Sequence, residues 1–248
     1  LFGKWHHGAP RAGEADYVHP MDHGFGEFVG FTDARHAWEH FPKELWFGRE
    51  RKPVDSRYAD SRFADLAIDF IARKKGEPFF LFLSCTSAHL LIEAPSEDVA
   101  EHAGKFRERD PAVPLNATYA AMVTRLDREV GRVLKALDDR GLAQDTIVVF
   151  SSDNGATFEA GNKGTSSFLD SNWPFRGQKR TLWEGGIRVP AVVRWPGQVP
   201  AARVSEEIVH MTDLLPTLLA ASGGERDLNS DEAVLKGTDV KFRPQGKC

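Results

Sequence analysis

The sequence is poor in several features that would each mark a class of protein. It has only two cysteines in 248 residues, Cys85 and Cys248, and two cannot form the disulfide framework of a small secreted scaffold. It has no unbroken apolar run of the ~20 residues that span a bilayer. Its net charge of -4 lacks the basic excess typical of nucleic-acid binding. We therefore expect no membrane span and no nucleic-acid partner.

What the chain does contain is typical of a globular protein with a sizeable core. Hydrophobic residues make up 41% of the chain and charged residues 27%. The length suits one α/β domain. The chain starts on Leu1 without an initiator Met or a visible signal peptide, so we expect it to begin inside a longer protein.

Two stretches repeat a helix followed by an apolar strand. After a cap at Asp60 or Ser61, apolar residues recur at helical spacing until Gly76, and a strand follows at Phe79–Leu83. The second stretch predicts a helix from Asn116 to Gly141 and a strand at Thr146–Phe150. Further along, we expect a strand at Val189–Arg194 and a helix over 205–224 that starts or kinks near Pro216, with long loops over 19–60.

This order of elements predicts the fold class. Uninterrupted apolar strands are typical of strands buried on both faces. Alternation with helices then predicts an α/β fold with a mostly parallel sheet flanked by helices on both faces. In such sheets ligands bind outside the carboxyl ends of the strands, so candidate site residues are sought there.

Polar residues follow the first two predicted strands. His89 comes after the first, and Asp153 and Asn154 come directly after the second. A carboxylate beside an amide offers two hard oxygen ligands suited to Ca²⁺ or Mg²⁺. The alternative is that Asp-Asn-Gly is simply good turn chemistry.

Two further stretches carry positive charge. "GQKRTLWEGG" places Lys179 among glycines that permit a close approach of backbone to a ligand, and the chain opens with Lys4 and His6 two residues apart. Taken singly, each stretch is equally consistent with a solvated loop. Together with His89 and a metal pair, they predict a cationic pocket for a tetrahedral oxyanion such as sulfate or phosphate.

Five stretches in order carry a family resemblance: "GKWHHG", "PFFLFLSCTSAH", "YAAMVTRLDREVGRVLKALDDRGLAQDTIVVFSSDNGA", "WPFRGQKRTLWEGGIRVPAVVRWPG" and "TDLLPTLLAASGG". They resemble the arylsulfatase-type sulfatases of the alkaline-phosphatase-like superfamily. The resemblance covers 1–224, the central part of the catalytic domain, and implies that 225–248 begin a C-terminal subdomain or linker. It also implies an α/β fold incomplete at both ends.

The resemblance assigns roles to six residues. It implies that Lys4 and His6 bind the sulfate group, that His89 protonates the leaving alcohol or contacts the sulfate, and that Lys179 bridges the sulfate and the leaving-group oxygen. Asp153 and Asn154 would be metal ligands, most often of Ca²⁺, with Mg²⁺ as the alternative. Ala88 and Leu91 stand where the family often has proline, and His7 is interpreted as a neighbour of the site.

The family's nucleophile is a formylglycine made from the Cys or Ser of a Cys/Ser-x-Pro-x-Arg motif. We expect this motif before Leu1, so the 248 residues alone are predicted to be inactive. Cys85 begins "CTSAH", with Ser87 and His89 where the motif needs proline and arginine, and is interpreted as a small buried residue.

The implied function is hydrolysis of a sulfate monoester on a sulfated small molecule or glycan. Localisation by resemblance is periplasmic, secreted or lysosomal. Two alternatives remain open: a phosphomonoester or phosphonate ester hydrolase of the same superfamily, and a non-catalytic sulfatase-like binding protein. Neither the particular ester nor the oligomeric state is specified by these residues.

Overall fold

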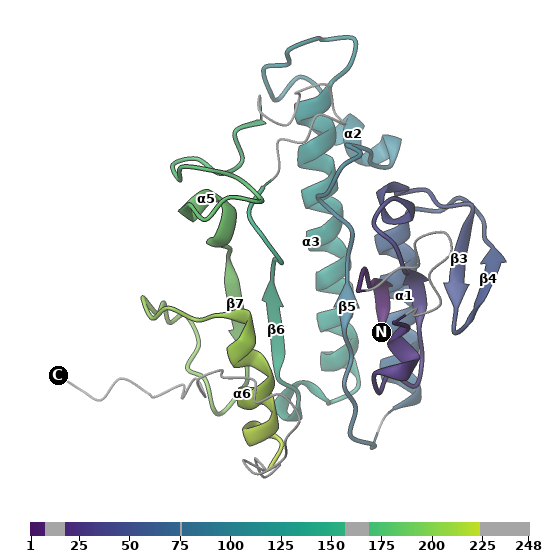
Figure 1. The fold of residues 1–248 in the computed structure, drawn as a ribbon, viewed down its shortest axis with the longest axis vertical. Helices are drawn as coiled ribbons and strands as arrows, with labels where there is room; N and C mark the ends of the chain where they lie inside the picture. Colours follow the sequence, from purple (N-terminus) through teal and green to yellow (C-terminus); the bar gives the residue numbers. More distant parts are fainter. Residues whose placement is uncertain (8–17, 75, 157–168, 224–248) are drawn as a thin grey trace. The chain divides into compact units, whose positions relative to one another are not determined.

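A computed structural model describes residues 1–7, 18–74, 76–156 and 169–223 (Figure 1). The chain forms two compact units, one of residues 1–143 and 151–191, the other of 144–150 and 192–248. The six predicted site residues all lie in the first unit. The predicted boundary at 224 lies at the edge of the described residues and stays a prediction.

A five-stranded sheet organises the first unit, in the order β4-β3-β2-β1-β5. The central strand β1 runs parallel to both of its neighbours, whereas β2 with β3 and β3 with β4 are antiparallel. The α/β class is therefore confirmed, with a mixed sheet. The strands are β1 (Phe2–Lys4), β2 (Val29–Phe31), β3 (Glu44–Phe47), β4 (Glu50–Pro53) and β5 (Leu83–Ser84).

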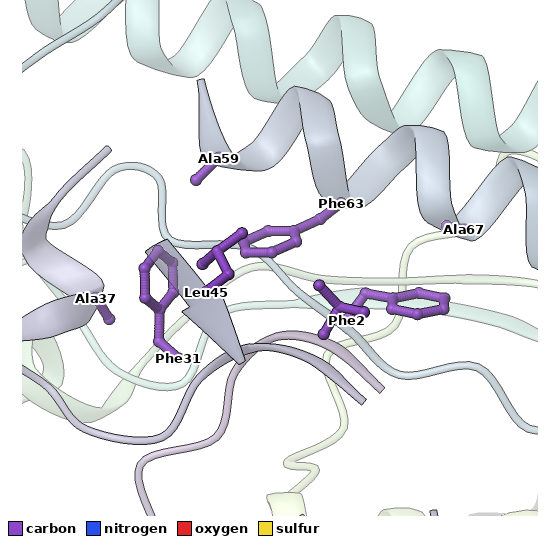
Figure 2. Close-up of a cluster of buried hydrophobic side chains, with 8 residues drawn as sticks. Phe2, Phe31, Ala37, Leu45, Ala59, Phe63 and Ala67 are labelled. Atoms are coloured by element: carbon purple, nitrogen blue, oxygen red, sulfur yellow. The ribbon is translucent and has the colours of Figure 1, made fainter. Parts of the chain in front are cut away.

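The core of the first unit lies between this sheet and helix α1 (Ala59–Arg73). Figure 2 shows Phe63 of α1 beside Phe31 and Leu45 of the sheet. All three residues are 0% exposed. The rings of Phe31 and Phe63 meet edge to face with centroids 5.7 Å apart. Burial of aromatic side chains of this size, each contributing roughly 1.5–3 kcal/mol, fixes α1 on the sheet.

Two glycines let the central strands approach closely. A Cβ on Gly3, which has φ 121°, would lie 1.9 Å from the carbonyl oxygen of Ser84 on β5. A Cβ on Gly30 of β2 would lie equally close to the carbonyl oxygen of Gly3. The pairing of β1 with both neighbours therefore depends on glycine, and it places Lys4 at the carboxyl end of the central strand.

The long helix α3 (Leu115–Asp139) packs beside α1, and α2 (Ser96–His102) packs on α3 (Figure 1). Their contacts include buried carboxylates that are paired. Glu129 of α3 accepts a hydrogen bond of 2.7 Å from the Ser61 hydroxyl of α1, and Asp98 of α2 is bound by Arg125 and Arg128 of α3. A buried charge is tolerated because its oxygens are paired in this way.

The remaining elements are short. They are η1 (Pro20–Asp22), η2 (His36–Trp38), η3 (Ala143–Asp145), α5 (Glu184–Ile187), a two-stranded sheet of β6 (Val148–Ser151) and β7 (Ala191–Arg194), η5 (Met211–Asp213) and α6 (Leu214–Ala221). No helix among the described residues is long and apolar enough to span a membrane.

The buried strand predicted at Phe79–Leu83 was wrong for most of its length. Only Leu83 and Ser84 form β5, which pairs with β1 alone among the described strands, and Phe80 is 65% exposed. The strand predicted at Thr146–Phe150, which corresponds to β6, is likewise only partly buried, since Phe150 is 39% exposed. An apolar run predicts a strand buried on both faces, but such burial also requires a helix or another segment packed on each face of the sheet.

The prediction of loops over 19–60 missed three strands. The hairpin of β3 and β4 turns at Gly48, where φ is 57°, so "FGRE" was its usable signal. The hairpin was overlooked because every residue of β4 is exposed and all but Pro53 are charged, so the strand lacks an apolar alternation.

Candidate active site

The first pair of predicted residues lies where β1 ends. Lys4 is the last residue of the strand and is half-buried, and His6 follows two residues later in the left-handed region with φ 51°. Trp5 between them is held at both ends: its amide donates to Phe31 O over 2.8 Å, and its indole Nε1 donates to Val18 O over 2.9 Å. The backbone that carries both side chains is therefore fixed.

The imidazole of His6 lies in a cationic environment. Partial burial lowers its pKa from 6.5, and the charges of Lys4, His7 and Lys179 lower it further, against an opposing effect of Asp33. The effect of Lys179 is notable because that residue lies far along the chain. His6 is consequently favoured as a neutral imidazole at pH 7, able to donate or accept a hydrogen bond.

His89 and Lys179 meet although ninety positions separate them in the sequence. The Nζ atom of Lys179 lies 3.3 Å from Nε2 of His89. The other ring nitrogen, Nδ1, lies 2.9 Å from Leu90 O, and a carbonyl can only accept, so Nδ1 carries the hydrogen. The bare Nε2 therefore accepts from the ammonium, which fixes the tautomer of His89.

Lys179 is tied by its backbone to the loop that carries Asp153 and Asn154. Its amide donates to Ala156 O over 2.9 Å. The buried side chain of Asn172 links the same segments, accepting from Ala156 N over 2.8 Å and donating to Gly177 O over 3.0 Å. These bonds place the candidate metal pair and Lys179 on neighbouring loops.

The glycines of the Lys179 loop pack against backbone in the structure. A Cβ on Gly185 would lie 2.4 Å from Gly177 O, and one on Gly155 would lie 1.9 Å from Gly185 O. For Gly177, Gly185 and Gly186 of this loop, the sequence predicted a close approach to a ligand. The structure gives another reason, which is the close approach of the Gly155 loop to the segment around Gly185.

Asp153 and Asn154 follow β6, as the sequence predicted, with Asp153 exposed and Asn154 half-buried. Within the described ranges there is no group of three or more His, Cys, Asp or Glu residues suited to hold a metal. The donor chemistry of the pair fits Ca²⁺ or Mg²⁺, since both are hard oxygen ligands, but the pair alone supplies only two of the six or so ligands required. The metal site stays a prediction.

Of the six predicted residues, the structure thus links four in pairs: Lys4 and Lys179 each act on the charge of His6, and Lys179 contacts His89. It relates Asp153 and Asn154 to Lys179 through the backbone. A cavity of about 790 Å³ in the same unit is lined instead by Glu39, Phe41, Lys43, Leu91, Glu93, Ala94, Ser96, Val99 and Thr118.

Cys85 lies directly after β5, and burial raises the pKa of its thiol well above the ordinary value. The nearby carboxylates of Asp60 and Glu129 raise it further. A thiol held in this protonated form is a poor nucleophile. Cys85 was interpreted as a small buried residue; its surface is half-buried in the structure, and the protonated thiol agrees with a residue that is not the nucleophile.

Comparison with known proteins shows the family, because the profile of the Sulfatase family matches residues 1–224. The chain belongs to the sulfatase family. Among its relatives, this sulfatase chain is 38% identical over 190 residues to the steryl-sulfatase of Mus musculus, covering 77% of this chain and 28% of that protein. It is 31% identical over 251 residues to the N-acetylgalactosamine-6-sulfatase of Sus scrofa, covering 94% and 44%.

Solved structures support the same assignment. The sulfatase chain superposes on the crystal structure of Ps i-CgsB in complex with k-i-k-neocarrahexaose with a TM-score of 0.79, at 28% identity over 97% of this chain and 53% of that one. The fold of yidJ from Bacteroides fragilis matches with a TM-score of 0.75 at 21% identity, over 97% of this chain and 55% of that one. The fold is therefore alkaline-phosphatase-like. The chain spans less than half the length of the two curated relatives named above.

Sequence reasoning missed several residues that support the site. Asn172 links the two loops described above, and His40 and Thr86 lie buried beside the His89 turn. Asp60 was predicted as a helix cap but its carboxylate bonds elsewhere. Their only signal in the sequence is a polar residue within or next to an apolar stretch, which does not indicate what the residue contacts.

Proposed function

We propose that the protein carrying this chain hydrolyses sulfate monoesters. The observation that carries the proposal is the 3.3 Å contact of Lys179 Nζ with His89 Nε2 in a chain of the sulfatase family. A cation and a tautomer-fixed imidazole with its nitrogen toward that cation are the groups needed to hold a sulfate ester and to act on its bridging oxygen.

In this proposal the two lysines bind the anion. Lys4 and Lys179 supply compact positive charges that stabilise the sulfate oxygens, more strongly in the transition state, where negative charge builds on the leaving oxygen. The lowered pKa of His6 keeps its imidazole neutral at pH 7, so it can orient the group by hydrogen bonding without adding a fixed charge. Each of these side chains lies on a backbone segment fixed by the bonds described above.

His89 is assigned to the leaving group. Its Nδ1–H is engaged by Leu90 O, so Nε2 is the ring atom that can take up a proton. The doubly protonated ring would then donate this proton from Nε2 to the departing alcohol and return to its Nδ1–H form. The ammonium of Lys179 beside Nε2 can bridge the sulfate and the leaving-group oxygen. Proton donation by a positioned group typically contributes 10²–10⁴-fold to the rate.

Asp153 and Asn154 are the residues that would hold a divalent cation, for which we propose Ca²⁺, with Mg²⁺ as the alternative. The bound ion would act as a Lewis acid toward the sulfate oxygens. We propose further that the nucleophile is a formylglycine outside these 248 residues, since no Cys or Ser here begins a Cys/Ser-x-Pro-x-Arg motif. The substrate class is a sulfated small molecule or glycan, and the location periplasmic, secreted or lysosomal.

The test uses the full-length protein and 4-nitrophenyl sulfate. We expect release of 4-nitrophenol, and a fall of kcat/KM of at least about 100-fold in Lys179→Ala, because a preorganised charge on the transition state is removed. The matched control is Lys105→Ala, which removes an exposed lysine beyond α2 and should leave kcat/KM within twofold. Calcium binding measured by calorimetry should be lost in Asp153→Ala.

Each alternative predicts a different outcome. Faster turnover of 4-nitrophenyl phosphate than of the sulfate would favour the phosphomonoester hydrolase. Binding of the sulfate ester without turnover would favour the non-catalytic protein. Full activity of Lys179→Ala would contradict the role proposed for the contact with His89.

A further inference from the structure

The turn that carries His89 is held by a buried carboxylate from another element. Asp60 lies in the first turn of α1 and is 0% exposed. Its Oδ1 accepts hydrogen bonds from the amide and the hydroxyl of Thr86, over 2.8 and 3.2 Å, and its Oδ2 accepts from the amide of Ser87 over 3.0 Å. Three donors on one buried carboxylate make this a strong, charge-assisted attachment.

His40 holds the same turn from a second side. It is also 0% exposed, and its Nε2 lies 3.1 Å from the carbonyl oxygen of His89. Because a carbonyl can only accept, Nε2 carries a hydrogen and donates it. The other nitrogen, Nδ1, lies 3.3 Å from the hydroxyl of Thr86, and the ring stacks on that of Tyr58 with centroids 5.8 Å apart.

Further contacts restrict the turn of residues 86–89 in addition to Asp60 and His40. Tyr58, the residue before α1, reaches the hydroxyl of Ser87 over 2.8 Å, and the amide of His89 donates to Thr86 O over 3.0 Å. The imidazole of His89 itself is bonded to Leu90 and stacked near the indole of Trp38, with centroids 6.3 Å apart. Its Nε2 edge meets Lys179.

We propose that His40 and Asp60 are positioning residues that set the place and the tautomer of the His89 imidazole. They act through the backbone of residues 86–89, which they bind directly, and Thr86 joins them because its hydroxyl lies within hydrogen-bonding distance of both. The inference rests on the proposed function, in which Nε2 of His89 exchanges a proton with the leaving alcohol. A displacement of about 1 Å at such a group can cost on the order of 100-fold in rate.

The experiment compares variants of the full-length protein at a temperature well below unfolding. His40→Leu removes the donor to His89 O, whereas His40→Gln offers an amide N–H in its place. We expect His40→Leu to lower kcat at least tenfold on 4-nitrophenyl sulfate, to change KM less than threefold and to shift the pH profile of kcat, and His40→Gln to recover part of kcat.

The control is His19→Leu, which removes another buried histidine whose Nε2 donates to a carbonyl, here Gly48 O over 3.0 Å. It should lower the melting temperature without changing the pH profile of kcat. Thr86→Val is the milder variant if His40→Leu does not fold, and it should change kcat in the same direction. Nitrogen-15 NMR of the histidine rings should show His89 as a single Nδ1–H tautomer in the wild type and a mixture in the variant.

The inference is overturned if His40→Leu or Thr86→Val lowers the melting temperature while kcat and its pH profile stay within twofold of the wild type. It is equally overturned if the NMR spectrum of His89 is unchanged in the variant. A wild-type protein that releases no sulfate would contradict the proposed function instead, and the NMR comparison would still decide the positioning role.

Discussion

Replacing Gly155 by alanine should damage the site without touching any charged residue in it. An added Cβ would lie 1.9 Å from Gly185 O, whereas ordinary contact begins at 3.4 Å, so the two loops must separate by about 1.5 Å. This movement strains the 3.0 Å hydrogen bond from Gly155 N to Gly186 O. Overpacking costs about 1–3 kcal/mol and a lost backbone bond about 1 kcal/mol, so we expect a destabilisation of about 2–4 kcal/mol.

The catalytic consequence follows from the bond next to this contact. Lys179 N donates to Ala156 O, one residue after Gly155, so a loop displaced by more than 1 Å carries Lys179 with it. We expect a fall in kcat/KM of roughly 100-fold. The assay is turnover of 4-nitrophenyl sulfate by the full-length protein, with the thermal midpoint from calorimetry on the same samples.

A second glycine provides the matched control. A Cβ on Gly131, within α3, meets nothing within 4 Å, so Gly131→Ala should leave kcat/KM unchanged. It should also stabilise the helix by up to about 1 kcal/mol, because alanine loses less backbone entropy than glycine. The reasoning would be refuted if Gly155→Ala melted with the wild type and retained its kcat/KM within twofold.

Two further predictions concern titrating groups. Because the fold lowers the pKa of His6, the unfolded chain protonates first as the pH falls below 6.5, so His6 makes the protein less stable in acid and has no such effect above that pH. Lys179→Gln should raise the pKa of His6 in an NMR titration, and an unchanged pKa would show that the two side chains do not interact. Because burial raises the pKa of the Cys85 thiol, iodoacetamide at pH 8 should alkylate Cys85 at least tenfold more slowly than after denaturation, as measured by peptide mass mapping. Equal rates before and after denaturation would mean that the thiol is accessible.

The sequence was informative about chemistry because the chemical identities of site residues are written in it directly. Lys4, His6, His89 and Lys179 stand in motifs whose order resembles one family, and membership of that family is confirmed. Helix α3 was predicted within a few residues of its observed bounds, since twenty-five residues of helical periodicity give a strong local signal. The roles of the six residues, and the metal, stay predictions.

Other features depended on contacts between distant parts of the chain. The apolar run at 79–83 predicts a buried strand, yet exposure of Phe80 is decided by which segments pack on each face. Likewise, Asp60 has the residue type and place of a helix cap, but its carboxylate bonds Thr86 and Ser87, twenty-six and twenty-seven positions away. The residues next to Asp60 in the sequence do not indicate which distant groups its carboxylate will bond in the folded chain.

The amino-acid sequence by itself determined the family, the α/β class and the residue types that can bind an oxyanion, because each depends on local patterns and on side-chain chemistry. Only the tertiary structure decided that Lys179 meets Nε2 of His89 and that glycines let the Gly155 loop and the Gly185 segment touch. It also decided that His40 and Asp60 hold the turn of residues 86–89. The physical reason is that hydrogen bonds act over about 3 Å, a distance that the chain reaches between remote residues only after it has folded.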